Sequence, residues 1–249
     1  MLETERHAII MRMVAELGTV RIQDLREETG SSESTIRRDL IELEKQRKLK
    51  RIHGGASKLQ GKLSESPMTE KSSKNLQEKQ EIAQLAASLV DENDTIYLDA
   101  GSTIYEMIRH LPPSVTVVTN GISHTDALLD RGCKTILTGG SAKPSTKALI
   151  GRGALASMNQ YRFDKCFLGV NGLHPDYGLT TPDEEEASMK ELAIRLSRDA
   201  FALVDPSKFQ EVSFARFAEL DEVTVLTTAA ARESLEHYPH SMKWKVTDQ

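Results

Sequence analysis

A run of small and hydroxyl-bearing residues, Asp99 to Thr103, has the composition of a phosphate-binding turn. It follows the apolar segment Thr95–Leu98, which we expect to be a strand, and it opens a helix. Gly101 lets a phosphate approach the backbone, and Ser102 and Thr103 can donate hydrogen bonds to it beside the first N–H groups of the helix. Since glycine and serine also occur where they merely form a turn, the motif alone leaves both interpretations open.

Polar or glycine-rich residues also follow later predicted strands. Ligands of open α/β sheets gather at the carboxyl ends of the strands, so these residues are expected to lie near the Asp99–Thr103 turn. Glu186 belongs to an acidic run that heads a helix, where a carboxylate also stabilises the helix by itself. The candidate effector-binding residues are Asp99, Gly101, Ser102, Thr103, Thr119, Asn120, Gly139, Gly140, Asn171, Gly172, Glu186 and Lys208.

A different chemistry is expected near the N-terminus, on a helix that includes Ser34 to Leu40. Ile36 and Leu40 are expected to face the core, which leaves hydroxyl and guanidinium groups on the outer face. Such groups bond phosphates and base edges in DNA, although a charged face that is merely solvated is the alternative. The candidate DNA-binding residues are Ser34, Thr35, Arg37, Arg38, Lys50, Arg51 and His53.

The charge distribution favours the DNA interpretation. The whole chain has a net charge of −5, which would disfavour binding to phosphates, but residues 34–58 carry eight basic and three acidic side chains. A local basic patch on an acidic protein is typical of a DNA-binding domain attached to a domain that stays off the backbone. Which arginine would contact a base is not fixed by the sequence.

The elements around this helix predict a winged helix-turn-helix domain over residues 1–57. Apolar residues at helical spacing predict one helix over 3–17 and a second over Ile22–Thr29, and Ser32 is expected to cap a third. Residues 49–55 alternate and then turn, as the wing would. Residues 58–76 are polar and are interpreted as a linker.

Residues 77–249 alternate between helical and strand patterns, which predicts an α/β domain with a mostly parallel, buried sheet. Cys133 and Cys166 are expected to be free buried thiols, and no metal site is predicted. There is no apolar run long enough for a transmembrane helix and no signal-peptide pattern, so a cytoplasmic protein without a membrane partner is expected. Besides Thr95–Leu98, the expected strands are Val115–Thr119, Thr135–Leu137, Lys165–Val170, Phe201–Val204 and Val223–Leu226.

Taken in order, several motifs resemble the DeoR family of bacterial repressors over nearly the whole chain. They are SSESTIRRDLIELE, LKRIHGGA, DAGST, VVTNG, LTGG, LIG, RFDKCFLGVNG, LTTPDEEEA and DPSKF. Within the family, segments 70–79, 158–172 and 205–220 look closest to repressors of fructose operons. The resemblance implies a homodimer or homotetramer that binds operator double-stranded DNA and is released by a phosphosugar, in that subgroup fructose 1-phosphate. It implies no cofactor and no catalysis.

The family's sensor domain resembles ribose-5-phosphate isomerase, which implies a Rossmann-like fold with a phosphate loop at Gly101–Thr103. Lys208 matches a ligand-binding lysine of those enzymes. This chain has Asn171 and Gly172 where the isomerases carry an acidic run, so their proton-handling carboxylates are missing. Thr228 is followed by Ala229 where most family members have Asp. An isomerase-like enzyme with an appended DNA-binding domain is the alternative, and the sequence does not separate a repressor from an activator.

Overall fold

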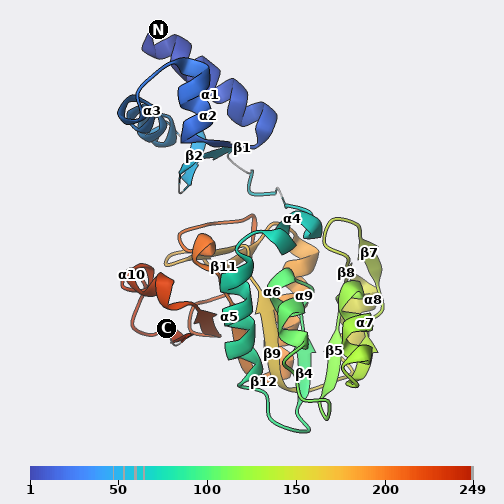
Figure 1. Cartoon of the computed structure of the whole chain (residues 1–249). Coiled ribbons are helices and arrows are strands. Elements are labelled where there is room, and N and C mark those ends of the chain that lie inside the picture. Colours follow the sequence, from blue (N-terminus) through green and yellow to red (C-terminus); the bar gives the residue numbers. More distant parts are fainter. Residues whose placement is uncertain (47, 53, 59–60, 64, 248–249) are drawn as a thin grey trace. The chain divides into compact units, whose positions relative to one another are not determined.

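The computed structural model describes residues 1–46, 48–52, 54–58, 61–63 and 65–247. The chain divides into two compact units, Met1–Gly61 and Lys62–Gln249, which are described separately (Figure 1). None of the described helices combines the length and the apolar character needed to cross a membrane.

The first unit consists of three helices and a small antiparallel sheet in which β3 lies between β1 and β2. The helices expected over 3–17 and 22–29 are confirmed, and each ends at a glycine with positive φ, Gly18 and Gly30. The expected cap at Ser32 is also confirmed, because its Oγ accepts the Thr35 N–H at 3.2 Å. The elements are α1 (Glu3–Leu17), β1 (Thr19–Arg21), α2 (Ile22–Thr29), α3 (Glu33–Lys45), β2 (Leu49–Ile52) and β3 (Gly55–Lys58).

A buried ion pair fastens α3 to α1. Asp39 of α3 accepts hydrogen bonds from Arg6 of α1, one of them 2.9 Å long, and lies 3.3 Å from the His7 ring. The two paired side chains are only 12% and 6% exposed. Burial by itself raises the pKa of Asp39, but its bonds to Arg6 lower that pKa overall. Asp39 directly follows Arg37 and Arg38 on α3. The ion pair between Arg6 and Asp39 therefore fixes the orientation of these two arginines relative to α1.

The second unit is built on a parallel sheet with the strand order β15-β14-β12-β9-β4-β5-β6 among the described residues. The expected strand Thr95–Leu98 is confirmed with the same ends, and the other five are confirmed with end shifts of up to four residues, whereas β15 was not expected. The strands are β4 (Thr95–Leu98), β5 (Thr116–Thr119), β6 (Lys134–Leu137), β9 (Phe163–Gly169), β12 (Ser197–Leu203), β14 (Thr224–Thr227) and β15 (Lys243–Val246).

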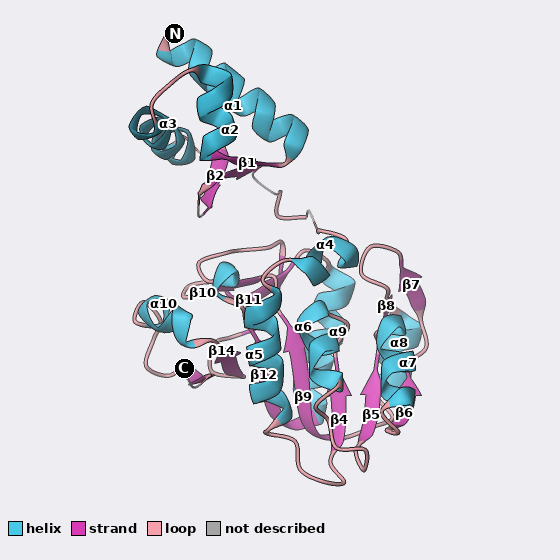
Figure 2. Cartoon of the chain, viewed as in Figure 1, coloured by secondary structure: helices cyan, strands magenta, loops and turns pink. Residues whose placement is uncertain are grey.

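Helices cover both faces of this sheet (Figure 2). Successive side chains of β9 point to opposite faces of the sheet. Cys166 and Leu168 belong to the hydrophobic core on one face, and Phe167 belongs to the core on the other. One core takes α5 (Leu76–Ala87), α6 (Ser102–Ile108) and α7 (Ile122–Asp130), and the other takes α8 (Arg152–Met158) and α9 (Glu184–Leu196).

Short antiparallel pieces that the sequence did not predict surround the carboxyl end of the sheet. A hairpin joins β7 (Ser141–Lys143) to β8 (Ala148–Ile150), and β11 pairs with both β10 and β13. The remaining elements are β10 (Gly172–His174), β11 (Gly178–Thr181), β13 (Ala215–Ala218), α4 (Met68–Ser73), α10 (Arg232–Leu235) and the 3-10 turns Pro206–Lys208 and Ala229–Ala231.

The strand order reverses direction at β4. From β4 the chain proceeds outward through β5 and β6, and it later returns to the other side of β4 with β9, followed by β12, β14 and β15. In open α/β sheets this switch point leaves a crevice at the carboxyl ends of the two adjacent strands. Here those ends are Asp99, after β4, and Asn171, after β9.

The segment 58–76, expected to be a linker, contains a short helix and makes contacts with the second unit. Residues from Lys62 onward belong to the second unit, and residues 68–73 form α4. The Met68 N–H donates to the Ser145 carbonyl at 2.9 Å, and Glu65 pairs with Lys143. These partners lie far along the chain, so a polar local composition gave no sign of them.

We predict that Asp39→Ala lowers the free energy of unfolding of the first unit by about 1–3 kcal/mol, because it leaves the charge of the partly buried Arg6 unpaired. Circular dichroism should report the loss in the helical transition, while the fluorescence transition of Trp244, the sole tryptophan, should not move. Glu28→Ala, which breaks the exposed pair with Arg12, is the matched control and should cost at most about 1 kcal/mol. An unchanged transition in Asp39→Ala would contradict a structural role for the pair.

Candidate functional site

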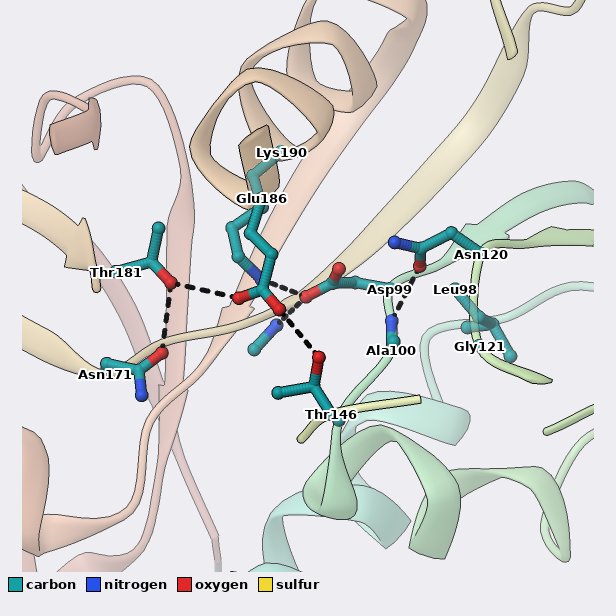
Figure 3. Close-up of polar contacts among 12 residues, drawn as sticks. Leu98, Asp99, Ala100, Asn120, Gly121, Thr146, Asn171, Thr181, Glu186 and Lys190 are labelled. Carbon is teal, nitrogen blue, oxygen red and sulfur yellow. Dashed lines mark hydrogen bonds and ion pairs between the residues drawn. The ribbon is translucent and has the colours of Figure 1, made fainter. Parts of the chain in front are cut away.

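A buried ion pair lies at the switch point. Asp99, directly after β4, pairs with Lys190 of α9, and both side chains are 4% exposed. The same carboxylate accepts the backbone N–H of Gly169, the last residue of β9, at 3.0 Å. Asp99 thus joins the ends of β4 and β9 to a helix on one face of the sheet, as Figure 3 shows.

A second carboxylate, Glu186, lies one turn before Lys190 on α9 and gathers hydroxyl groups (Figure 3). Its Oε1 accepts from Thr146 at 2.8 Å and its Oε2 from Thr181 at 3.4 Å. The Thr181 hydroxyl also lies 3.2 Å from the Asn171 side-chain oxygen. The structure therefore brings two predicted residues, Asn171 and Glu186, into one polar cluster beside Asp99.

Lys143 of β7 connects this cluster to the segment that joins the units. Its Nζ lies 3.2 Å from Glu186, 2.9 Å from Asp183 and 2.6 Å from Glu65. Glu65 also pairs with Lys71 at 2.6 Å. Burial by itself lowers the pKa of Lys143, but the surrounding carboxylates raise it overall, so the lysine stays charged.

The predicted phosphate turn and the buried Lys79 contact the same backbone carbonyl, that of Lys71. Ser102 Oγ lies 3.4 Å from the carbonyl oxygen of Lys71, and the same oxygen accepts a hydrogen bond from Lys79 Nζ. Lys79, on α5, is 5% exposed. Gly101 caps α6 in an extended conformation, and Thr103 is buried.

The Lys79 ammonium has no carboxylate within ion-pair distance among the described residues, and its hydrogen bond goes to the peptide carbonyl of Lys71. Burial lowers the pKa of Lys79, the charge of Asp205 opposes that shift, and the charges of Lys208 and Lys71 add to it. A buried ammonium near two other lysines is costly without an anion. Perturbed pKa values are more frequent at functional sites than elsewhere, which makes Lys79 a candidate ligand-binding residue.

Lys208 closes the 3-10 turn Pro206–Lys208 after β12. Its side chain is 34% exposed and its Nζ lies 4.0 Å from Asp205. Asp205 is buried and accepts from the Asn75 side chain at 2.8 Å, just before α5 begins. Among the described residues, Lys208 is therefore the lysine within 4.0 Å of Asp205, while Lys79 interacts with that carboxylate only through longer-range charge. Lys79 and Ser102 share the Lys71 carbonyl oxygen as a neighbour.

Other predicted residues brace the loops. Asn120 Oδ1 accepts the Ala100 N–H at 2.8 Å, and Thr119 Oγ1 donates to the Leu98 carbonyl at 2.7 Å. A Cβ atom on Gly172 would lie 2.4 Å from the Glu211 carbonyl oxygen, so this glycine permits a close backbone contact. Gly139 and Gly140 approach Gly153 and Ala154 at the start of α8, and their described contacts are not with the Asp99–Glu186 cluster.

Sequence reasoning missed several residues of the site. Lys190 follows Glu186 by four residues and therefore shares its helix face, a spacing that could have drawn attention to it. Glu65, Lys71, Lys79 and Thr146 carry no local signal of this kind, because their partners are distant in sequence.

Four of the predicted DNA-binding residues lie on α3. Arg37 and Arg38 are exposed, and Arg37 pairs with Glu33 one turn earlier at 2.6 Å. Ser34 and Thr35 bring their hydroxyls within 2.9 and 2.8 Å of Ser32 Oγ. The two hydroxyls thus take part in the capping of α3.

The other three DNA-binding candidates were expected in the wing. Lys50 and Arg51 lie on β2, where Arg51 is exposed and its guanidinium is 3.8 Å from Glu44. His53 lies outside the described residues. α3 and β2, which contact each other, therefore carry the four predicted basic residues Arg37, Arg38, Lys50 and Arg51.

A winged helix-turn-helix unit joined to an α/β unit with polar residues at its switch point is the architecture of transcription regulators that carry a sensor domain. A model of the DeoR-like helix-turn-helix domain matches residues 6–61, and a model of the DeoR C terminal sensor domain matches residues 74–230. The chain belongs to the DeoR family.

Relatives that match over almost the whole chain are known from bacteria. The chain is 48% identical over 248 residues, 99% of each chain, to a protein of Bacillus subtilis (strain 168) described as the uncharacterized HTH-type transcriptional regulator FruR. It is 31% identical to the lactose phosphotransferase system repressor of Staphylococcus epidermidis (strain ATCC 12228 / FDA PCI 1200), over 92% of this chain and 94% of that one. Ribose 5-phosphate isomerase A from Methanocaldococcus jannaschii is similar with a TM-score of 0.41 and 17% identity, over 54% of each chain.

One buried histidine supports the phosphate turn. His124 of α7 is 1% exposed, and its Nε2 lies 3.3 Å from the Gly101 carbonyl oxygen. Burial lowers the pKa of His124 to about 4, against a smaller opposing effect of the bond to Gly101. The ring is therefore neutral at neutral pH, with Nε2 as the protonated nitrogen that donates to Gly101.

We predict that this histidine makes the second unit sensitive to acid. As pH falls from about 6.5 towards 4, the unfolded chain binds a proton that the folded state resists, so stability should fall by up to about 1.4 kcal/mol per pH unit. Above pH 6.5 the group should have no effect.

Urea unfolding followed by Trp244 fluorescence measures this slope. His124→Gln should make it shallower in that window, and His237→Gln, at an exposed histidine, is the control. Equal slopes in wild type and His124→Gln would contradict the prediction.

Proposed function

We propose that this protein is a cytoplasmic repressor of a sugar catabolic operon, released from its operator by a phosphosugar. The proposed effector is fructose 1-phosphate. The observation that carries the proposal is the buried Lys79 ammonium, which lacks a close carboxylate among the described residues and lies beside Ser102. The phosphate of a sugar would supply the missing negative charge.

The proposed phosphate position lies between the Gly101–Thr103 turn, Lys79 and Lys208. Ser102 and the turn backbone would donate hydrogen bonds, and the two lysines would supply charge. Asp205, held by Asn75, balances part of that charge. A dianion is a better match for the remaining charge than a neutral sugar.

The sugar itself would extend from this position towards the Asp99–Glu186 cluster. Carboxylate, amide and hydroxyl groups there suit the recognition of sugar hydroxyls, since each accepts or donates directional hydrogen bonds. Because Glu65, Asp183 and Glu186 outnumber Lys143 and Lys71, this end of the site is acidic. A second phosphate would be repelled there, so the proposal favours a monophosphate over a bisphosphate.

A regulator is favoured over the isomerase-like enzyme. Asn171 stands where a proton-transferring carboxylate would be needed, and it is engaged with Thr181. Asp99 is paired with Lys190 and bonded to the Gly169 N–H, which is a structural use of its oxygens. The relatives described as regulators also support this choice.

On the DNA side, the proposal is a homodimer or homotetramer that places α3 of each subunit in a major groove. Arg37, Arg38, Lys50, Arg51 and His53 would contact phosphates or bases there, together with Ser34 and Thr35. The effector would bind more tightly to the conformation that holds the winged helices away from their half-sites.

We predict that Arg37→Ala and Arg38→Ala each weaken operator binding and reduce its dependence on salt. Loss of one phosphate contact should lower the slope of log affinity against log salt by about one. Fluorescence anisotropy with operator DNA at several salt concentrations measures this. Arg12→Ala, at an exposed arginine of α1, is the matched control. Full-strength operator binding by both variants would refute the proposed interface.

We also predict that Lys208→Ala yields a repressor that binds its operator but responds poorly to the effector. Loss of one charge-assisted hydrogen bond costs about 1.5–3 kcal/mol, so effector affinity should fall about 10- to 100-fold. An anisotropy titration of the operator complex with fructose 1-phosphate tests this. Lys134→Ala, at an exposed lysine where β6 begins, is the control. Release of Lys208→Ala at the wild-type effector concentration would contradict the assignment.

A further inference from the structure

The segment that leads from the first unit into the second contributes a carboxylate to the proposed effector site. Glu65 lies four residues after Gly61, where the first unit ends, and its side chain is only 7% exposed. It accepts hydrogen bonds from Lys71 and Lys143, each at 2.6 Å. Burial by itself raises the pKa of Glu65, but the two lysines lower it overall, so the group is an anion at neutral pH.

Lys71 connects Glu65 to the proposed phosphate position. Its side chain pairs with Glu65, while its backbone carbonyl accepts from Lys79 and lies 3.4 Å from Ser102 Oγ. A phosphate bound between Ser102 and Lys79 would therefore lie near Lys71, attract its ammonium group and repel the Glu65 carboxylate.

The charge balance around Lys143 adds to this competition. Its ammonium already faces Glu65, Asp183 and Glu186. An anion that approaches these three carboxylates is repelled by them. Asp183 and Glu186 are fixed at the N-terminus of α9, as its N-cap and in its first turn, whereas Glu65 is not part of that helix. Glu65 is thus the group whose departure would relieve the excess negative charge.

The segment is held by polar contacts that can be exchanged. Residues 68–73 form α4, which has no buried residue, and the Met68 N–H donates to the Ser145 carbonyl at 2.9 Å. Few apolar contacts would be lost if it detached, so its release would not require unfolding of the core.

We propose that Glu65 is an internal anionic ligand, which the phosphate of the effector displaces, and that its displacement frees the segment leading to the DNA-binding unit. This rests on the proposed function, because the competing anion is the phosphate of the phosphosugar. The ligand class is a phosphate monoester bound beside Ser102 and Lys79, and the group for which it competes with Glu65 is the Lys71 ammonium.

Glu65→Gln in the full-length protein tests the competition. Without the carboxylate, fructose 1-phosphate and inorganic phosphate should each bind about tenfold more tightly by titration calorimetry, and the operator should be released at correspondingly lower fructose 1-phosphate. Glu70→Gln is the matched control, since it removes the same charge from an exposed pair of the same segment. It should bind both anions as the wild type does.

Hydrogen–deuterium exchange tests the release of the segment. Without ligand, the Met68 amide should exchange faster in Glu65→Gln than in wild type or Glu70→Gln. With fructose 1-phosphate, the Met68 amide of the wild type should also exchange faster.

Three outcomes overturn the inference. If fructose 1-phosphate releases the wild type but Glu65→Gln has wild-type or weaker affinity, the proposed function stands and this inference fails. If Met68 exchange is the same in Glu65→Gln and wild type, Glu65 does not hold the segment. If neither anion binds to any variant, both the inference and the proposed effector fail.

Discussion

The geometry of the switch point depends on the buried pair of Asp99 and Lys190. Burying an unpaired charge in a protein interior costs several kcal/mol of desolvation free energy. Asp99 and Lys190 therefore hold each other in position. Asp99 also accepts the Gly169 N–H, which ties the end of β4 to the end of β9. One carboxylate therefore fixes three elements at the point where the strand order reverses. Loops that begin at this point, including the Gly101–Thr103 turn, start from a rigid base.

The same pair sets the chemical asymmetry of the site. Residues four apart on a helix share a face, so the position of Lys190 also determines where Glu186 projects. Glu186 contacts Thr146, Thr181 and Lys143, whereas Lys208 lies 4.0 Å from Asp205 and Lys79 bonds to the Lys71 carbonyl. An acidic, hydroxyl-rich region thus adjoins a region with excess positive charge, a distribution that matches a sugar carrying one phosphate.

The sequence predicted the framework better than the contacts. Apolar runs such as Val117 and Val118 in β5 predict buried parallel strands because burial on both faces demands them. Three-residue strands such as β7 leave no comparable pattern. Lys190 looks like an ordinary surface lysine paired with Glu186, yet its partner is Asp99, 91 residues away. Glu65 likewise sits in a polar stretch, and its partner Lys143 lies 78 residues further on. Local composition cannot encode such pairings, because they depend on which strand ends the fold brings together.

The energetics of regulation favour the junction between the units as the element that changes. Allosteric coupling typically amounts to about 1–3 kcal/mol, which is the size of one charge-assisted hydrogen bond gained or lost. Rearranging either hydrophobic core would cost far more, since removing a single large side chain from a core already costs about 2–5 kcal/mol. The described contacts of residues 65–71 with the rest of the second unit are mainly polar, and α4 buries no residue. A phosphate can take the place of a carboxylate in an ion pair with a lysine, whereas it makes no favourable contact with an apolar interface. Ligand binding can therefore alter how firmly this segment is held while both cores remain as they are.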